Sequence, residues 1–189
     1  MPEKDVLIEE IERVHKNLTD LRQEYWLHYD LFSYQWWLLL TVFVISWVVW
    51  WRLVDKHRLK EVASFGVSMS YLIYILDHVG YELNLWLYPH KFMRILPEAF
   101  ILDLGILPIL HMLVFQYFRE WKSFIIANTL LAAVLAFICE PISVWLGIYK
   151  MLNWAHIYSF PIYILKAVMM KRLFEIIIRK QNASTNAER

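Results

Sequence analysis

Residues 36–54 read WWLLLTVFVISWVVWWRLV, an apolar run whose only charged residue is Arg52. Tryptophan pairs stand near both ends of the run, Trp36–Trp37 and Trp50–Trp51. In a helix these pairs lie roughly 22 Å apart, a distance that fits aromatic belts at the two faces of a bilayer. No small-residue cleavage site follows the run, so it predicts a membrane anchor that stays in the protein and not a signal peptide.

The composition of the whole chain agrees with a membrane protein. Hydrophobic residues make up 59% of the chain and aromatic residues 17%, above the usual share in a soluble domain. Only 4 glycines and 6 prolines are available for turns, so the elements are expected to be long helices. The single cysteine excludes an internal disulfide and a thiolate metal site.

Five segments satisfy the length of about 20 residues that a spanning helix needs. The predicted spans are about 36–54, 62–80, 97–118, 123–149 and 157–178. The third is expected to begin at Pro97–Glu98, and the fifth is the most interrupted by charge. The predicted fold is therefore all-α: a five-helix transmembrane bundle over 35–180, with an extramembrane amphipathic heptad helix over 1–34 and a disordered tail over 181–189.

The distribution of basic residues predicts the orientation. Five spans leave the termini on opposite sides, with seven Lys and Arg residues in the segments on the amino-terminal side and eleven on the other. Basic residues concentrate in cytoplasmic segments. The carboxyl terminus is therefore predicted to be cytoplasmic.

The amino-terminal segment carries an a/d heptad pattern of about three heptads. Its seam consists of Leu7, Ile11, Val14, Leu18, Leu21 and Tyr25, followed by His28. Three interpretations are open: a coiled coil that makes the protein an oligomer or holds a partner, a helix that packs on its own bundle, and a helix on the lipid surface. The narrow stripe and the shortage of lysine argue against simple membrane adsorption.

Ionisable residues inside apolar segments are the main functional signal. An ionisable group in hydrocarbon costs at least a few kcal/mol unless it is paired, hydrated or used. Counting outward from the connecting turns predicts one polar layer on the side of the 81–96 segment, with an ion pair between Glu140 and Lys166 and with His111 deeper. The predicted layer is Asp77, Asp103, His111, Glu140 and Lys166.

Prolines interrupt two of the helices that carry this layer. Pro108 follows Asp103, and Pro141 follows Glu140 directly. Each proline removes a hydrogen bond and should free a carbonyl one turn earlier. Acids beside broken helices resemble the ion sites of transporters. The alternative is a structural polar layer that only sets how the helices pack.

Motifs of other classes are missing from the sequence. The seven histidines form no H-E-x-x-H or similar spacing, so no metal site is predicted. There is no glycine-rich phosphate loop, no G-x-S-x-G and no soluble basic domain for nucleic acid. No enzyme activity, catalytic residue or cofactor is therefore expected. The expected partners are membrane lipids and either further copies of the chain or another membrane protein.

Residues 140–164, EPISVWLGIYKMLNWAHIYSFPIYI, with the preceding 88–118, resemble an uncharacterised family of small multi-spanning membrane proteins of spore-forming Gram-positive bacteria. The resemblance covers roughly residues 80–170. Its motif residues are Tyr88–Pro89, Pro97, Asp103, Pro108, Glu140–Pro141, Trp145, Tyr149, Trp154 and Ser159–Phe160–Pro161. The resemblance implies a multi-pass protein of the bacterial cytoplasmic membrane and brings no activity with it.

Two functions therefore stay open. The first is a structural or interaction subunit that assembles through the heptad seam and small-residue faces. The second is a transporter or channel component that uses the Asp, Glu and Lys layer for a proton or cation. The first ranks slightly ahead, because five spans make a thin pathway for a monomer.

Overall fold

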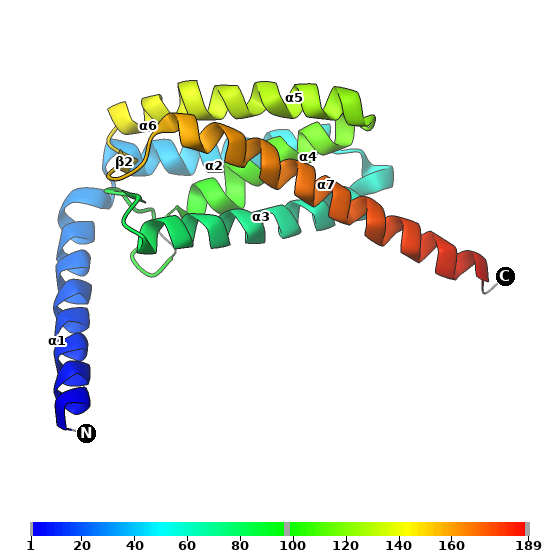
Figure 1. Cartoon of the computed structure of the whole chain (residues 1–189). Helices are drawn as coiled ribbons and strands as arrows, with labels where there is room; N and C mark the ends of the chain where they lie inside the picture. Colours follow the sequence, from blue (N-terminus) through cyan, green and yellow to red (C-terminus); the bar gives the residue numbers. More distant parts are fainter. Residues whose placement is uncertain (1, 97–98, 188–189) are drawn as a thin grey trace.

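The computed structural model describes residues 2–96 and 99–187, and these residues are almost entirely helical (Figure 1). The α-helices are α1 Pro2–Tyr25, α2 Tyr34–Leu53, α3 Leu59–Glu82, α4 Leu107–Tyr117, α5 Trp121–Val134, α6 Glu140–Trp145 and α7 His156–Ala187. Short π-helical and 3₁₀ turns join several of them. The predicted all-α class is confirmed, and the expected start of the third span at Pro97–Glu98 lies outside the described residues.

Three helical segments are long and apolar enough to cross a membrane: Tyr34–Leu53, Lys56–Glu82 and Trp121–Trp145. They correspond to the first, second and fourth predicted spans. The segment Leu102–Tyr117, in place of the third, is apolar but shorter. Charged residues interrupt α7, which holds the fifth. Three candidate spans are therefore confirmed by length and composition, and five remain a prediction.

Each predicted break coincides with a π-helical turn. The turn Leu102–Ile106 precedes α4 and Pro108 stands in the first turn of α4, while the turn Leu135–Cys139 precedes α6 and Pro141 stands in the first turn of α6. A proline ring displaces the carbonyl four residues before it, and a wider turn accommodates that displacement. The first of these turns contains Asp103, and the second ends directly before Glu140.

The helices α2, α3, α5 and α7 run along one general direction, with α4 among them (Figure 1). α3 packs on α4 and α7, and α5 packs on α7. The largest hydrophobic core lies between them and includes Phe65, Phe115 and Phe174. The Phe65 and Phe115 rings stack with centroids 4.1 Å apart, and Phe174 meets Phe65 edge-on at 5.4 Å. These rings fill the bundle on the side away from Asp77 and Glu140.

Around its apolar core the bundle also buries polar side chains, and it exposes many large apolar ones. Buried polar side chains of the bundle include Asp103, His111, Asn128, Lys166 and Lys171. Large apolar side chains lie exposed along the outside, as on α2 (Val44, Ile45, Val48 and Val49) and on α5 (Ile125, Ile126, Leu130 and Val134). A monomeric soluble protein rarely exposes so continuous an apolar surface.

The helix α1 lies crosswise at the end of the bundle where α2 begins and α3 ends, and its amino-terminal part extends past α3 (Figure 1). Its seam is exposed, from 43% at Leu18 to 66% at Ile11. Packing of the whole seam on the bundle, one of the three interpretations, is therefore not what this fold adopts. Self-association stays a prediction.

The carboxyl-terminal segment differs from the expected disordered tail. α7 continues through residues 181–187 and ends at Ala187. Each further residue in a helix adds one backbone hydrogen bond, and no Gly or Pro occurs in this segment to end the helix.

The segment 81–96 is a loop with one short strand. β1, Trp86–Leu87, pairs antiparallel with β2, Lys150–Met151. Asn84 turns the chain with a positive φ of 54°, a conformation that Asn tolerates better than most residues. The strand pair brings Trp86 against Gly80 of α3, where a Cβ atom would collide with the indole ring. This loop forms one wall of the site described next.

Candidate functional site

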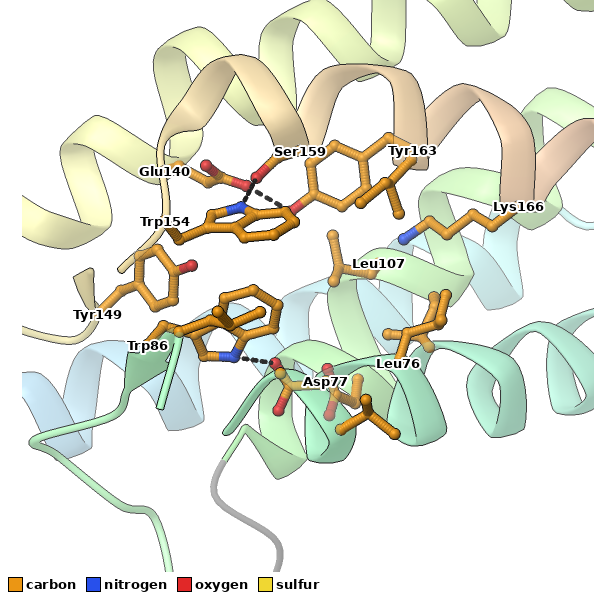
Figure 2. Close-up of a pocket in the computed structure, with 16 residues that line it drawn as sticks. Leu76, Asp77, Trp86, Leu107, Glu140, Tyr149, Trp154, Ser159, Tyr163 and Lys166 are labelled. Carbon is orange, nitrogen blue, oxygen red and sulfur yellow. Dashed lines mark hydrogen bonds between the residues drawn. The ribbon is translucent and has the colours of Figure 1, made fainter. Parts of the chain in front are cut away.

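A pocket of about 220 Å³ lies toward the end of the bundle where α3 ends and α7 begins (Figure 2). Asp77 of α3, Asp103 of the first π-helical turn, Glu140 of α6 and Lys166 of α7 all line it. Four of the five residues of the predicted polar layer therefore share one pocket. Most of the remaining wall is apolar or aromatic, including Leu107, Trp86, Tyr149 and Trp154.

Asp77 is held by the loop wall. The Trp86 indole N–H donates to Asp77 Oδ1 at 3.0 Å, and the Tyr88 hydroxyl donates to the same oxygen. Burial, with the Asp77 and Asp103 carboxylates, raises the pKa of Tyr88 well above its usual value, so the phenol stays protonated and remains a donor. Asp77 is thus a fixed hydrogen-bond acceptor at one side of the pocket.

Glu140 is held on the opposite side. The Tyr163 hydroxyl donates to Glu140 Oε1 at 2.7 Å, and His156 Nδ1 donates to Oε2 at 2.8 Å. Trp154 is fixed nearby, since its indole N–H donates to Ser159 at 3.0 Å. Figure 2 shows Asp77 and Glu140 on different walls, with Trp86 and Trp154 between them.

The predicted ion pair between Glu140 and Lys166 is wrong for the described residues, because the Lys166 ammonium has no carboxylate oxygen within 4.0 Å. It points into the pocket (Figure 2) and lies 4.3 Å from the centre of the Tyr163 ring. Glu140 and Lys166 nevertheless line one pocket, at the common level that counting residues from the connecting turn predicts. The donors Tyr163 and His156 occupy the glutamate oxygens instead.

Within the described residues, Asp103 and Lys166 are charged groups of the pocket that lack hydrogen-bond or ion-pair partners. Asp103 is 2% exposed, and its Oδ2 atom accepts no hydrogen bond from the described residues. Lys166 is 5% exposed; among the described residues its ammonium contacts the Tyr163 ring and interacts with the nearby acids only at longer range. Burial of a charge without a partner costs free energy, and this cost falls when the group becomes neutral or gains a hydrogen bond.

His111 lies outside the pocket wall. It is 2% exposed, and within the described chain neither ring nitrogen has a hydrogen-bond partner, although Asn128 and Lys166 are near enough to interact with it. Asn128 is fully buried and is held to α7 by a bond of 3.4 Å from its amide to the Ile164 carbonyl. The deepest polar group is therefore separated from the other four.

The three acids do not converge. Within residues 2–96 and 99–187 no three His, Cys, Asp or Glu side chains lie close enough to share a metal ion. Asp77 and Asp103 nevertheless lie near enough for their charges to interact.

Sequence reasoning missed the donors that hold the acids: Trp86, Tyr88, His156 and Tyr163. The aromatic density of 81–96 and the motif residues Tyr88, Tyr149, Trp154 and Ser159 were the signals available. Comparison with protein-family models, with curated proteins and with solved structures found no match to this chain.

Proposed function

We propose that this chain is an integral membrane protein whose central pocket binds and relays protons, as a component of a transporter or channel. The bundle exposes large apolar side chains along its outside and buries ionisable groups beside its apolar core, an arrangement that lipid surroundings favour and water does not. By the distribution of basic residues its carboxyl terminus is cytoplasmic, and the resemblance implies the bacterial cytoplasmic membrane.

One observation supports the role of the pocket: an acid and an amine, Asp103 and Lys166, line one cavity. Among residues 2–96 and 99–187, neither Asp103 Oδ2 nor the Lys166 ammonium has an ion-pair or hydrogen-bond partner. The cost of that arrangement falls when one proton moves from the ammonium to the carboxylate, which leaves both groups neutral. Coupled groups of this kind share protons as a pair.

The proposed entry for protons is the end of the bundle that carries α1. His156, whose side chain is 27% exposed, donates to Glu140, and Glu140 lines the pocket. Beyond the pocket, the rings of Phe65, Phe115 and Phe174 fill the bundle. The described fold therefore resembles a site open from one side, and transport would require movement of these rings.

Of the two functions that the sequence suggests, this geometry favours the relay over a purely structural subunit. A structural polar layer is expected to satisfy its own groups, as Glu140 is satisfied by Tyr163 and His156. Asp103 Oδ2 has no such partner in the part of the chain that the structure describes.

The test is proton flux into liposomes that contain the purified protein and a pH-sensitive dye. The wild-type protein should collapse an imposed pH gradient faster than empty liposomes. Asp103→Asn, Glu140→Gln and Lys166→Met should each slow the flux about tenfold or more, the scale expected for loss of a proton-transfer group.

The matched control is Asp20→Asn, which neutralises an exposed acid of α1 outside the pocket. It should conduct like the wild type. Proton flux in Asp103→Asn and Lys166→Met equal to that of the wild type, with all variants folded and inserted, would refute the relay.

A further inference from the structure

The junction between α1 and the bundle contains two adjoining hollows beside the pocket, and Asp77 lines both the pocket and one of these hollows. They measure about 450 and 510 Å³ and share five lining residues, Leu18, Arg22, Tyr81, Lys91 and Arg94. One hollow is mainly apolar, with Leu21, Trp26, Leu87 and Pro89 added. The other adds polar groups, including His15, Asp77, His78 and Glu82.

The apolar face of α1 is turned toward the bundle. Leu18 and Tyr25, both seam residues, line the apolar hollow together with Leu87 of β1. Seam residues share one stripe of the helix, so Leu7, Ile11 and Val14 point the same way beyond the end of α3. At 100° per residue, Asp5, Glu9, Glu12 and Asp20 fall on the opposite face.

The direction of α1 decides what that stripe meets. The helix lies crosswise to α2 and α3 (Figure 1), so when these helices span a bilayer α1 lies along its surface. The stripe then faces the hydrocarbon and the acidic face meets water, which is the arrangement of an interfacial helix. The first span starts at the same level, with Trp36 and Trp37 available as interfacial anchors.

The junction is held in place by polar contacts. Arg22 donates to the hydroxyl of Tyr81 at the end of α3. Asp30, 2% exposed, accepts from His90 Nδ1 at 2.7 Å and from the Lys91 backbone N–H at 3.1 Å. The side chains of Arg22, Lys91 and Arg94 therefore converge on the hollows from α1 and from the loop.

From this arrangement we infer that α1 is an interfacial anchor and that the hollows at its root hold an anionic phospholipid. The phosphate lies among Arg22, Lys91 and Arg94, and the acyl chains lie along Leu18, Leu21 and Leu87. The apolar hollow carries these three basic residues against one acid, Asp30, and the remaining positive charge at the level of the headgroups is complementary to such a lipid. The inference rests on the proposed membrane insertion and is independent of the proton relay.

The first test measures the depth of α1 in vesicles of phosphatidylglycerol and phosphatidylcholine. A fluorescent label is attached at Ile11→Cys or Glu12→Cys in a Cys139→Ser background, and brominated lipid acts as quencher. Ile11→Cys should be quenched strongly and Glu12→Cys weakly. Val48→Cys, on the exposed face of α2, is the reference for insertion and should also be quenched.

Each other outcome is informative. If Val48→Cys is not quenched, membrane insertion fails, and the inference fails with it. If Val48→Cys is quenched but Ile11→Cys is no more quenched than Glu12→Cys, α1 is not an interfacial anchor. If Ile11→Cys is unquenched and cross-links between copies, the seam belongs to a second copy of this chain. Both of these results leave the proton-flux result standing.

The second test measures the lipid itself. Protein purified from the same vesicles should retain phosphatidylglycerol in preference to phosphatidylcholine, and excess inorganic phosphate should not displace it. Arg94→Gln should lower the retained phosphatidylglycerol about fivefold, the change expected for one basic residue at a membrane surface. Arg52→Gln, an exposed arginine of α2 outside the hollows, should retain it normally. Equal retention by Arg94→Gln and the wild type would overturn the lipid site.

Discussion

The Lys166 ammonium lies 4.3 Å from the centre of the Tyr163 ring, and the hydroxyl of the same ring donates to Glu140. One tyrosine therefore stands between the amine and the acid, facing the first with its ring and the second with its hydroxyl. The tyrosine keeps the two charges in one pocket without direct contact.

Tyr163→Phe keeps the ring under Lys166 and removes the donor to Glu140. The loss of one hydrogen bond to a buried carboxylate should cost about 1–3 kcal/mol in the free energy of unfolding. Proton flux should also change, since Glu140 loses one of its two donors. Unfolding in mixed detergent measures the first effect. Tyr158→Phe, whose ring packs on Trp154 and is exposed, is the control and should alter neither property.

Phe115→Ala should remove one ring of the Phe65, Phe115 and Phe174 cluster, which in the proposed relay fills the bundle beyond the pocket. Truncation of a buried phenylalanine costs about 3–5 kcal/mol, and Phe115 stacks on Phe65 with an interplanar angle of only 5°. Any protein that remains folded should leak protons faster than the wild type. Phe32→Ala, at a position 65% exposed, should have little effect. A folded Phe115→Ala protein with wild-type flux would contradict the closing role of the ring.

Gly80→Ala should disturb the loop wall. The added Cβ would collide with the rigid Trp86 ring, which must shift and weaken its bond to Asp77. Tryptophan fluorescence and unfolding of the variant should both differ from those of the wild type. Gly66→Ala is the comparison, because its new Cβ meets the flexible Met112 side chain. We expect the smaller loss of stability at Gly66, since a methionine can change rotamer.

Asp30 should make stability depend on acid pH. Burial raises the pKa of the Asp30 carboxyl above the usual 3.8, and the Lys91 N–H and His90 offset this only in part. Between pH 3.8 and the raised pKa, the Asp30 carboxyl binds more protons in the folded state than in the unfolded chain. Its contribution to stability therefore falls as the pH rises through that window. The wild-type protein should show this slope in unfolding experiments, and Asp30→Asn should reduce it. An unchanged slope would contradict the assignment.

Much of the fold could be read from the residue pattern, because a long apolar run with few Gly or Pro residues satisfies its backbone groups most readily as a helix. The run 36–54 and the helix α2, Tyr34–Leu53, nearly coincide. Pro108 and Pro141 gave the places of the two π-helical turns within one turn of helix. The predicted third and fifth spans do not meet the criterion of length and apolar composition for crossing a membrane. The segment Leu102–Tyr117 is too short, and charged residues interrupt α7.

The sequence by itself determined most of the helices, their breaks and the common level of Asp103, Glu140 and Lys166 in the bundle, because these depend on local hydrogen bonding and on counting residues from the turns. Only the tertiary structure decided the partners of these groups and the direction of α1. Those depend on contacts between segments far apart in the chain, such as Tyr88 with Asp77 and Arg22 with Tyr81. Helical periodicity defines a face of α1 but carries no information about whether that face meets a protein or a lipid.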